Sequence, residues 1–247
     1  MTEDLLIVAA GMGTRLRAKG NLKPLVELDG TPMIEHAMDA AFAAGMKRAT
    51  VVTGYHADVL EEFLDTLADK RGWQINTVHN PDFMYPNGLS VLKAASVLDG
   101  PFCLAMCDHL VEPKLYQRLL ATALKDDEVA LAIDKRLGNP YVDIDDVTKV
   151  RLSGRHIKGI GKDIPVYNAF DCGIFSANPA LFEAIEKGGR ETNDYSISGG
   201  MMMLAAESKA IGVDVGDAFW IDVDCPEMHT LAQQWIDSGR NRSAAAS

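Results

Sequence analysis

The first half of the chain alternates short apolar runs with longer segments in which apolar residues recur at helical spacing. The segments that we predict to be strands cover residues 5–9, 49–53, 74–79, 102–106 and 129–133. The segments between them, which we predict to be helices, cover residues 31–44, 57–70, 89–98 and 113–123. Thr31 would cap the first helix and Pro32 would open it. Because short apolar runs are typical of strands buried on both faces, this alternation predicts a parallel sheet with helices on both faces.

The second half of the chain is less regular and richer in strand patterns. Ser153 and Gly154 separate two runs, 148–152 and 156–160, as the turn of a hairpin would. Further predicted strands cover residues 169–175, 210–215 and 219–223. We therefore expect a Rossmann-like α/β fold with a mixed, mostly parallel central sheet and an added β-rich region. No linker interrupts the pattern, which predicts one domain over residues 1–238 and a flexible tail at 239–247.

Net charge restricts the class of partner. The 247 residues contain 24 Lys and Arg against 35 Asp and Glu, which gives a net charge of −11. Duplex nucleic acid and anionic membrane surfaces both require a basic face, so neither is an expected partner. A small phosphorylated molecule needs only a few local cations and stays compatible with this charge.

The same composition predicts a cytoplasmic protein. Its four cysteines have neither zinc-ligand spacing nor the density of a disulfide framework, so we expect them to be reduced. Glu3 and Asp4 precede the first apolar run, where a signal peptide would have basic residues. No run approaches ~18 apolar residues, so we predict no membrane insertion. The oligomeric state is left open by the sequence.

The strongest local motif is the glycine turn that directly follows the first predicted strand. In Gly11-Met12-Gly13-Thr14-Arg15, two glycines allow main-chain N–H groups to approach a phosphate. Arg15 adds a forked donor and Lys23, within Lys23-Pro24-Leu25, adds a point charge. The motif is neither a dinucleotide fingerprint, because Leu16 replaces the third glycine, nor a P-loop. The alternative is an ordinary turn with surface cations; we interpret the motif as a phosphate site.

Acidic residues follow two other predicted strands. Asp108 ends an apolar strand, at the sheet edge where ligands of α/β proteins gather, and a carboxylate there suits Mg²⁺. Asp222 and Asp224 lie on one face of a strand, where they repel each other unless a cation is near. The competing interpretations are that Asp108 or Asp224 only caps the following segment, and that His109 is only a hydrogen-bond partner.

Residues 9–16 together with Lys23-Pro24-Leu25 resemble the signature of the nucleotidyltransferases that activate sugar phosphates and related alcohol phosphates. Within that superfamily, the chain most resembles the CTP:inositol-1-phosphate cytidylyltransferase domain. The stretches that carry this closer resemblance cover nearly the whole chain: 87–90, 106–109, 142–144, 148–150, 160–162, 171–175 and 220–224. The resemblance implies a nucleotidyltransferase fold with a nucleotide-binding half at 1–134 and a β-rich acceptor-binding half at 135–238.

The resemblance also implies a role for individual residues. The catalytic set is Arg15, Lys23 and Lys149, of which Lys149 would meet the acceptor phosphate. The nucleotide-binding set is Ala9, Ala10, Gly11, Gly13, Thr14, Asn80, Asn87, Gly88 and Ser90. The acceptor-binding set is His109, Asp134, Asp143, Lys162 and Asp171, and the Mg²⁺ ligands are Asp108, Asp224 and Asp222. Each acceptor residue, taken alone, is also compatible with a purely structural role, and Ser90 with a helix cap.

The implied reaction transfers a cytidylyl group from CTP to inositol 1-phosphate or a similar alcohol phosphate and releases pyrophosphate. A phosphate acceptor is already anionic, so no general base is needed, and no His–carboxylate or Ser–His pair stands out. Phosphocholine or an organic phosphonate is a second possible acceptor. A cationic headgroup would call for an aromatic cage, for which the candidates are Tyr55, Tyr85, Tyr141, Tyr167 and Trp220. Uridylyl or thymidylyl transfer to a hexose 1-phosphate is also compatible with these motifs, as is a non-catalytic nucleotide-binding regulator.

Overall fold

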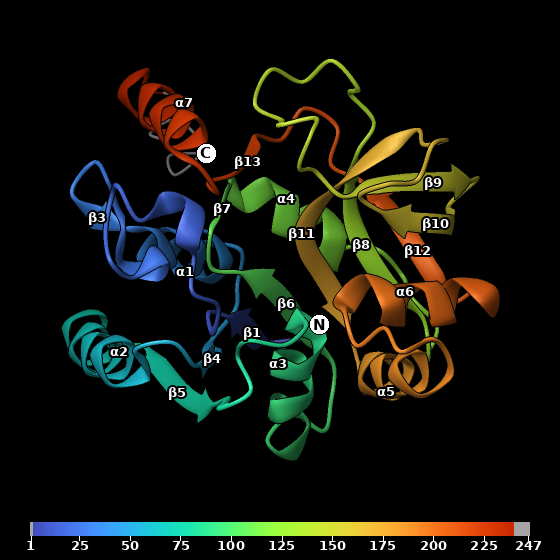
Figure 1. The fold of residues 1–247 in the computed structure, drawn as a ribbon, viewed down its shortest axis with the longest axis horizontal. Helices are drawn as coiled ribbons and strands as arrows, with labels where there is room; N and C mark the ends of the chain where they lie inside the picture. Colours follow the sequence, from blue (N-terminus) through green and yellow to red (C-terminus); the bar gives the residue numbers. More distant parts are fainter. Residues whose placement is uncertain (1, 240–247) are drawn as a thin grey trace.

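A computed structural model describes residues 2–239 of the chain. Its centre is a nine-stranded sheet with the strand order β5-β4-β1-β6-β11-β8-β12-β10-β9 (Figure 1). Four strands of this sheet come from the first half and are parallel to one another: β1 (Asp4–Val8), β4 (Arg48–Thr53), β5 (Gln74–His79) and β6 (Phe102–Met106). The predicted parallel sheet is confirmed for these four strands, whereas the fifth predicted strand, 129–133, is separated from them by an antiparallel strand.

The second half extends this sheet with strands of both directions. They are β8 (Val129–Asp134), β9 (Lys149–Ser153), β10 (His156–Gly161), β11 (Ala169–Ala177) and β12 (Ala210–Asp214). β11 runs antiparallel to both of its neighbours, β6 and β8, and so joins the two halves. β10 is antiparallel to β9 and β12, whereas β12 is parallel to β8. The predicted mixed sheet with an added β-rich region is confirmed.

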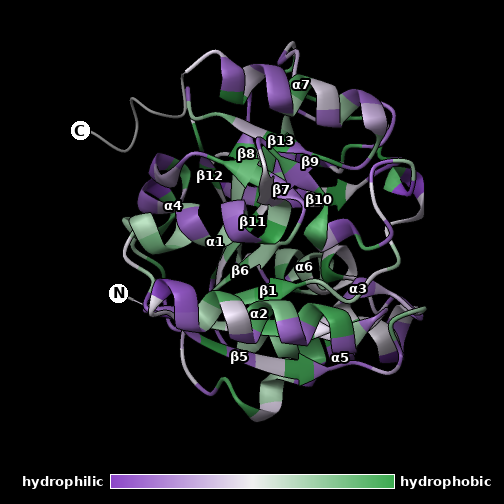
Figure 2. Ribbon diagram, turned by 90° about the vertical axis from the view of Figure 1, so that its left-hand side faces the viewer, coloured by the Kyte–Doolittle hydropathy of each residue, from purple (hydrophilic) through white to green (hydrophobic). Residues whose placement is uncertain are grey.

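Helices cover both faces of the sheet, and the apolar strands lie between them (Figure 2). One face packs against α1 (Met33–Ala43), α2 (Ala57–Arg71) and α4 (Pro113–Leu120). The other packs against α3 (Asn87–Lys93), α5 (Ala180–Thr192) and α6 (Ile197–Ala206). Alternate residues of β1 pack into the apolar cores on the two faces of the sheet. Leu5 and Ile7 belong to one core, and Leu6 and Val8 belong to the other. This burial on both faces explains why β1 is apolar throughout.

A smaller third core lies beside the carboxyl ends of the strands. β7 (His109–Val111) pairs antiparallel with β13 (Trp220–Asp222), outside the main sheet, and α7 (Pro226–Asp237) packs against them. The short pair β2 (Glu27–Leu28) and β3 (Thr31–Pro32) packs alongside. Two expectations need correction here. The helix predicted from residue 31 begins at Met33, because Thr31 and Pro32 pair with β2, and 219–223 does not join the central sheet.

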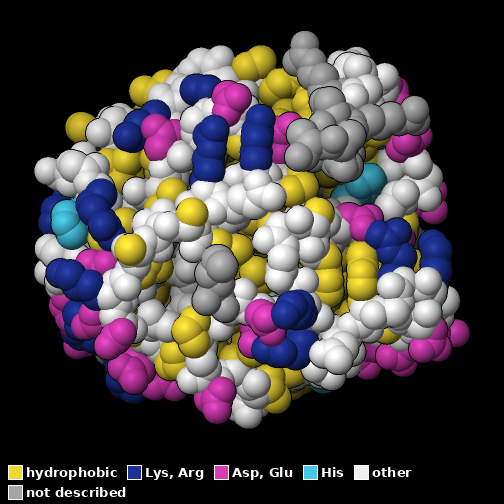
Figure 3. All heavy atoms as spheres, turned by 180° about the vertical axis from the view of Figure 1, so that it is seen from behind, with side chains coloured by type: hydrophobic (Ala, Val, Ile, Leu, Met, Phe, Trp, Pro, Cys, Tyr) yellow, Lys and Arg dark blue, Asp and Glu magenta, His cyan; other side chains and the backbone are white. Residues whose placement is uncertain are grey.

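Other boundaries also differ from the predicted ones. The helix predicted at 89–98 begins earlier, at Asn87, and ends in a separate turn, η3 (Ala94–Ser96). No helix within residues 2–239 combines the length and the apolar character needed to cross a membrane. The face in Figure 3 mixes Lys and Arg with Asp and Glu. The predicted flexible tail lies outside the described residues, apart from Gly239.

Candidate active site

The glycine turn after β1 is shaped by the lysine that packs against it. Gly13 has a φ of 55°, and a Cβ atom placed on it would lie 2.3 Å from the Cβ of Lys23. A side chain at Gly13 would therefore be strained and would displace Lys23. The short helix η1 (Thr14–Leu16) follows directly and places Arg15 beside the turn. Lys23 itself begins the short helix η2 (Lys23–Leu25).

Two adjoining cavities lie where the strands of the first half end. The glycine-turn cavity, of about 330 Å³, is lined by Gly11, Gly13, Thr14, Arg15, Lys23, Phe83, Tyr85, Asn87 and Ser90, among others. The acidic cavity, of about 190 Å³, has His109 and Lys162 in its wall together with the carboxyl groups of Asp108, Asp143, Asp146, Asp171, Asp222 and Asp224. The walls of both include Asn87, Met106, Asp108 and Asp224. Ligands in the two cavities would therefore meet beside Asp108 and Asp224.

Lys23 lies at this boundary between the cavities. Its side chain is only 9% exposed, and its ammonium group forms ion pairs with Asp108, at 2.5 Å, and with Asp224. Burial works to lower the pKa of Lys23, but the carboxylates of Asp108 and Asp222 outweigh burial and raise the pKa. Burial likewise works to raise the pKa of Asp108, which Lys23 and His109 instead hold well below its usual range. Lys23 is thus the internal counter-ion of this acidic cluster.

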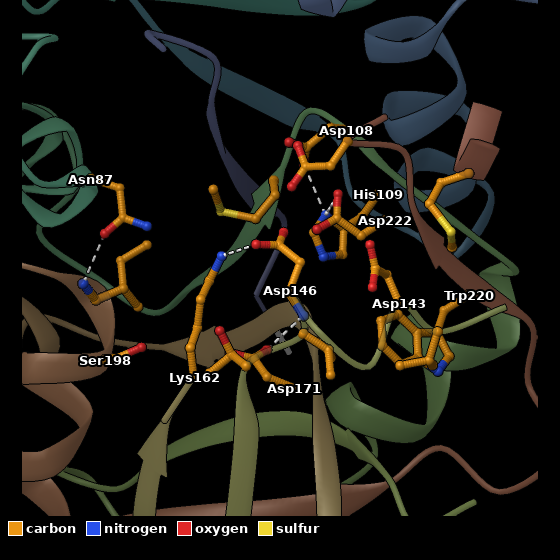
Figure 4. A pocket seen from close by; sticks show the side chains of 18 of the residues that line it. Asn87, Asp108, His109, Asp143, Asp146, Lys162, Asp171, Ser198, Trp220 and Asp222 are labelled. Carbon is orange, nitrogen blue, oxygen red and sulfur yellow. Dashed lines mark hydrogen bonds and ion pairs between the residues drawn. The ribbon is translucent and has the colours of Figure 1, made fainter. Parts of the chain in front are cut away.

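His109 lies between Asp108 and Asp222 in this acidic cluster. Its Nδ1 atom lies 2.8 Å from Asp108 Oδ1 and 3.9 Å from Asp222 Oδ1 (Figure 4). Burial works to lower the pKa of His109, but Asp222 and Asp108 raise it to about 9, so the ring is cationic at neutral pH. Burial raises the pKa of Asp222, and the charge of Asp108 adds to the increase. Asp222 Oδ1 is buried without a hydrogen-bond partner among the described atoms.

The cluster fits a Mg²⁺ ion by its donor chemistry. Ligand atoms of Asp146, Asp222 and Asp224 lie within 4.8 Å of one another, as do those of Asp108, His109 and Asp222. Carboxylate oxygens are the ligands that Mg²⁺ prefers, and one or two of them suffice when substrate phosphates supply the rest. The unpartnered Asp222 Oδ1 gives one oxygen that such an ion would satisfy. The predicted ligands Asp108, Asp222 and Asp224 therefore fit Mg²⁺ by their chemistry. Binding of the ion at this site stays a prediction.

Asp146 belongs to the same group, although the sequence patterns did not single it out. Its Oδ2 atom accepts a hydrogen bond from Arg15, at 2.9 Å, and its Oδ1 atom accepts one from Lys162, at 2.6 Å. Burial works to raise the pKa of Asp146, but Arg15 and Lys162 lower it, so the group is ionised. The acidic run 143–146 contains this residue, but nothing in that run distinguishes Asp146 from its neighbours.

Three predicted acceptor residues besides His109 line the acidic cavity: Asp143, Lys162 and Asp171. Asp171 lies on β11 and accepts a hydrogen bond from the main-chain N–H of Gly173, at 2.7 Å. Burial raises the pKa of Asp171 to about 6. Figure 4 displays these side chains around one space, with Trp220 at its side.

Two further predicted residues lie outside both cavity walls. Asp134 is fully buried and accepts hydrogen bonds from Arg136, Asn139 and the indole N–H of Trp220. Asp134 therefore holds the start of the 135–148 loop and one wall residue of the acidic cavity, and its own side chain lines neither cavity. Lys149 donates to the main-chain carbonyl of Lys162, at 2.9 Å. Lys162, and not Lys149, is the lysine in the cavity wall.

Some of the predicted nucleotide-binding residues line a cavity, and the others lie behind the cavity wall. Ala9, Gly11, Gly13, Thr14, Asn87 and Ser90 line the glycine-turn cavity. Asn80 is buried and donates to Ser90 Oγ at 2.9 Å, so it braces the loop below the cavity. A Cβ atom on Gly88 would lie 2.2 Å from the carbonyl oxygen of Tyr195, so this glycine permits close packing. Ala10 packs against Gly54 beneath the turn.

Beyond Asp146, several wall residues have no role predicted from the sequence. Phe83 lines the glycine-turn cavity, and Thr148 and Ser198 line the acidic cavity. Ser198 comes from α6, a helix for which no prediction was made. Trp220 and Tyr141 were named only as cage candidates, and both are in the wall of the acidic cavity.

Known proteins resemble this chain over most of its length. The bifunctional IPC transferase and DIPP synthase of Rubrobacter xylanophilus is 32% identical over 243 residues, which cover 95% of this chain and 53% of that protein. The chain spans about half the length of this relative and of those with the same name in Aquifex aeolicus and Thermococcus kodakarensis. The UTP–glucose-1-phosphate uridylyltransferase AglF of Haloferax volcanii is 24% identical, over 93% of this chain and 94% of its own length.

Solved structures support the fold independently. The inositol-1-phosphate CTP transferase from T. maritima superposes with a TM-score of 0.82 and 22% identity, over 94% of this chain and 96% of that one. A UDP-glucose pyrophosphorylase in complex with UDP-glucose gives a TM-score of 0.79 at 20% identity, over 97% of this chain and all of that one. The predicted nucleotidyltransferase fold is thereby confirmed. The model of the MobA-like NTP transferase domain matches residues 5–155, more than half of the chain, so this protein belongs to the MobA-like NTP transferase family.

Proposed function

We propose that this chain transfers a cytidylyl group from CTP to inositol 1-phosphate or a similar alcohol phosphate and releases pyrophosphate. The observation that carries the proposal is the shared wall of the two cavities, where Lys23, Asp108 and Asp224 meet. A transfer reaction between two anions requires two sites that adjoin at one point, with cations close to that point.

The glycine-turn cavity is the proposed CTP site. Main-chain N–H groups at Gly11 and Gly13 would contact phosphate oxygens, and Arg15 and Lys23 would neutralise the triphosphate. Phe83 and Tyr85, in the same wall, offer aromatic surfaces for the base. Asp108, Asp222 and Asp224 would hold Mg²⁺, which when bound would supply positive charge beside the triphosphate and the departing pyrophosphate.

The acidic cavity is the proposed acceptor site. Lys162 is the cation that would attract the acceptor phosphate, a role that the sequence analysis gave to Lys149. Asp143 and Asp171 would accept hydrogen bonds from the hydroxyl groups of a polyol such as inositol. The acceptor phosphate is ionised at neutral pH, so alignment and charge stabilisation would account for the rate without a general base.

The named relatives support this acceptor and this nucleotide to different degrees. The names "IPC transferase" and "inositol-1-phosphate CTP transferase" belong to proteins matched over nearly all of this chain. The second candidate, uridylyl transfer to a hexose 1-phosphate, is favoured by the uridylyltransferase of Haloferax volcanii, which the chain covers over 94% of its length. Cytosine and uracil differ by an amine donor against a carbonyl acceptor, so a nucleotide panel separates the two.

A phosphocholine acceptor has weaker support. Of the five cage candidates, Tyr141 and Trp220 line the acidic cavity, Tyr85 lines the other cavity, and Tyr55 and Tyr167 line neither. Trp220 is 1% exposed, with its indole N–H bonded to Asp134. Two aromatic side chains, one of them this buried, do not make a closed cage for a quaternary ammonium group.

Pyrophosphate release tests the proposal directly. Purified protein with Mg²⁺ is assayed with CTP or UTP against inositol 1-phosphate, glucose 1-phosphate and phosphocholine, and CTP with inositol 1-phosphate is expected to be fastest. Lys23→Ala should lower that rate by on the order of 100-fold or more, because a preorganised charge is lost. Lys47→Ala, at a surface ion pair with Glu3, is the matched control. Wild-type turnover in Lys23→Ala, or full activity in EDTA, would contradict the proposed site.

A further inference from the structure

Asp146 connects the two proposed substrate sites through their cations. Arg15, one partner, follows the glycine turn, and Lys162, the other, follows the end of β10. The Arg15 side chain is 50% exposed and that of Lys162 is 52% exposed, whereas that of Asp146 is 23% exposed. One carboxylate on a loop therefore contacts two long, half-exposed side chains that come from opposite sides of the site, and the guanidinium of Arg15 also forms an ion pair with Asp224.

The loop that carries Asp146 is itself well anchored. The main-chain N–H groups of Asp146 and Val147 both donate to the carbonyl of Asp143, at 3.2 and 2.8 Å. Asp134 holds the beginning of the loop, and the main-chain N–H of Asp171 donates to the carbonyl of Thr148 at its end. The position of Asp146 is therefore set by hydrogen bonds to the Asp134 carboxylate at the start of the loop and by main-chain hydrogen bonds at its turn and at its end.

A carboxylate so close to two anionic substrates cannot bind their phosphates itself, because like charges repel. Both of its oxygens already accept hydrogen bonds from cations, whereas Asp222 Oδ1 has no hydrogen-bond partner among the described residues and only the more distant His109 Nδ1, at 3.9 Å, beside it. Asp108 and Asp224 are paired with cations in the same way, and ligand atoms of Asp146 lie within 4.8 Å of those of Asp222 and Asp224, so a test of Asp146 must also measure metal binding. What Asp146 offers is preorganisation, since free Arg and Lys side chains lose rotamer entropy when they are ordered.

We propose that Asp146 is a positioning residue that holds Arg15 and Lys162 in fixed relation, so that the nucleotide and acceptor phosphates meet in line. The inference rests on the proposed transfer reaction. It predicts different effects of an Asp146 substitution on KM and on kcat. Asp146→Asn removes a negative charge from between two anions, so the KM values for CTP and for the acceptor should not rise. The value of kcat should fall by about 10- to 100-fold, because misplaced reacting groups slow the chemical step.

The experiment compares Asp146→Asn with Asp145→Asn, an exposed neighbour on the same loop. The control should keep wild-type kcat and KM. Asp146→Glu, which keeps the charge, should recover part of the lost kcat. In Lys162→Met and Arg15→Met backgrounds, Asp146→Asn should cost clearly less than it does alone, because one of the side chains that it positions is gone. Melting temperatures of all variants identify any change that is only structural.

Each outcome decides a separate point. Unchanged kcat in Asp146→Asn, a rise in KM at constant kcat, or losses that multiply in full in the double variants would overturn the inference. Binding of Mn²⁺ to the nucleotide-free protein, measured by calorimetry, should be within about twofold of wild type in Asp146→Asn. A tenfold loss would make Asp146 a metal ligand instead. If the wild type releases no pyrophosphate with any nucleotide or acceptor, the proposed function falls, and this inference falls with it.

Discussion

Lys23 is the residue on which the charge balance of the site depends. Its buried ammonium group lies between Asp108 and Asp224, two of the predicted ligands of Mg²⁺. Because the ammonium and a divalent ion would compete for the same oxygens, Lys23→Met should bind Mn²⁺ about tenfold more tightly than wild type in the absence of nucleotide. The variant should also melt at a lower temperature without the ion, since two carboxylates lose their counter-charge.

Calorimetric titration with Mn²⁺ measures the first effect and thermal melting with and without Mn²⁺ measures the second. Lys47→Met serves as a control for the loss of a surface lysine. Weaker binding of Mn²⁺ by Lys23→Met would mean that the lysine supports the ion site and does not compete for it.

Asp134 makes a contribution to stability that depends on pH. Burial works to raise its pKa, but the hydrogen bonds from Arg136, Trp220 and Asn139 outweigh burial and lower it. A carboxyl group with a lowered folded-state pKa stabilises the fold above its unfolded pKa of about 3.9 and stops doing so as the pH falls through the folded value. Asp134→Asn should therefore reduce the free energy of unfolding by about 2 kcal/mol at pH 7.

Urea denaturation of wild type and Asp134→Asn between pH 3 and pH 7 tests this. The difference in unfolding free energy should be constant from pH 5 to pH 7 and should shrink below pH 4. A difference that is the same at pH 3 and pH 7 would exclude the charge of Asp134 as its cause.

Among the elements, β11 contains the most specialised piece of backbone. Its pairing with β8 shifts register between Asp171 and Phe175, and Gly173 within this bulge has a φ of 71°. A Cβ atom at Gly173 would lie 2.4 Å from His109 Nε2. Gly173→Ala should therefore destabilise the fold by about 1–2 kcal/mol through its backbone alone and should also displace His109. The bulge is thus what leaves room for the imidazole in the acidic cavity.

Chemical denaturation measures the loss of stability, and the acceptor KM reports the displaced ring. Gly154→Ala is a useful control, because Gly154 also has a positive φ, of 61°, yet nothing lies within 4 Å of its Cβ position. Equal effects of the two substitutions on the acceptor KM would rule out the contact with His109 as the cause.

The sequence predicts an element well where a single hydrophobic pattern runs through the whole segment. The apolar runs of β1, β4, β6 and β8 are buried on both faces, so their pattern and their location agree. It predicts ends poorly, as at Thr31, where pairing with β2 replaces the helix cap that local preference favours. α6 escaped prediction because it is apolar on most sides, with Gly199 and Gly200 at its start, and so lacks a clear amphipathic pattern.

At the scale of the whole molecule, the site is assembled from segments that are distant in sequence. Local motifs identified Lys23, Asp108, Asp222 and Asp224, because each follows a recognisable turn or strand. They could not identify Asp146, whose role arises only from contacts with Arg15, 131 positions earlier, and Lys162, 16 positions later. For the same reason they could not separate Lys149 from Lys162, since both flank the same hairpin and only the folded chain directs one of them into the cavity.

The strand β11 has a consequence for how the molecule can be divided. It comes from the acceptor half of the sequence, yet it lies between β6 and β8, both of which belong to the first 134 residues. A fragment of residues 1–134 would have a gap in the middle of its sheet, and a fragment of 135–238 would lack β6 and β8 and would pair β11 only with β9, over two residues. Neither fragment should fold when expressed alone, as judged by circular dichroism and resistance to protease. Neither half should therefore be exchangeable between relatives as an independent module, because each half completes the sheet of the other.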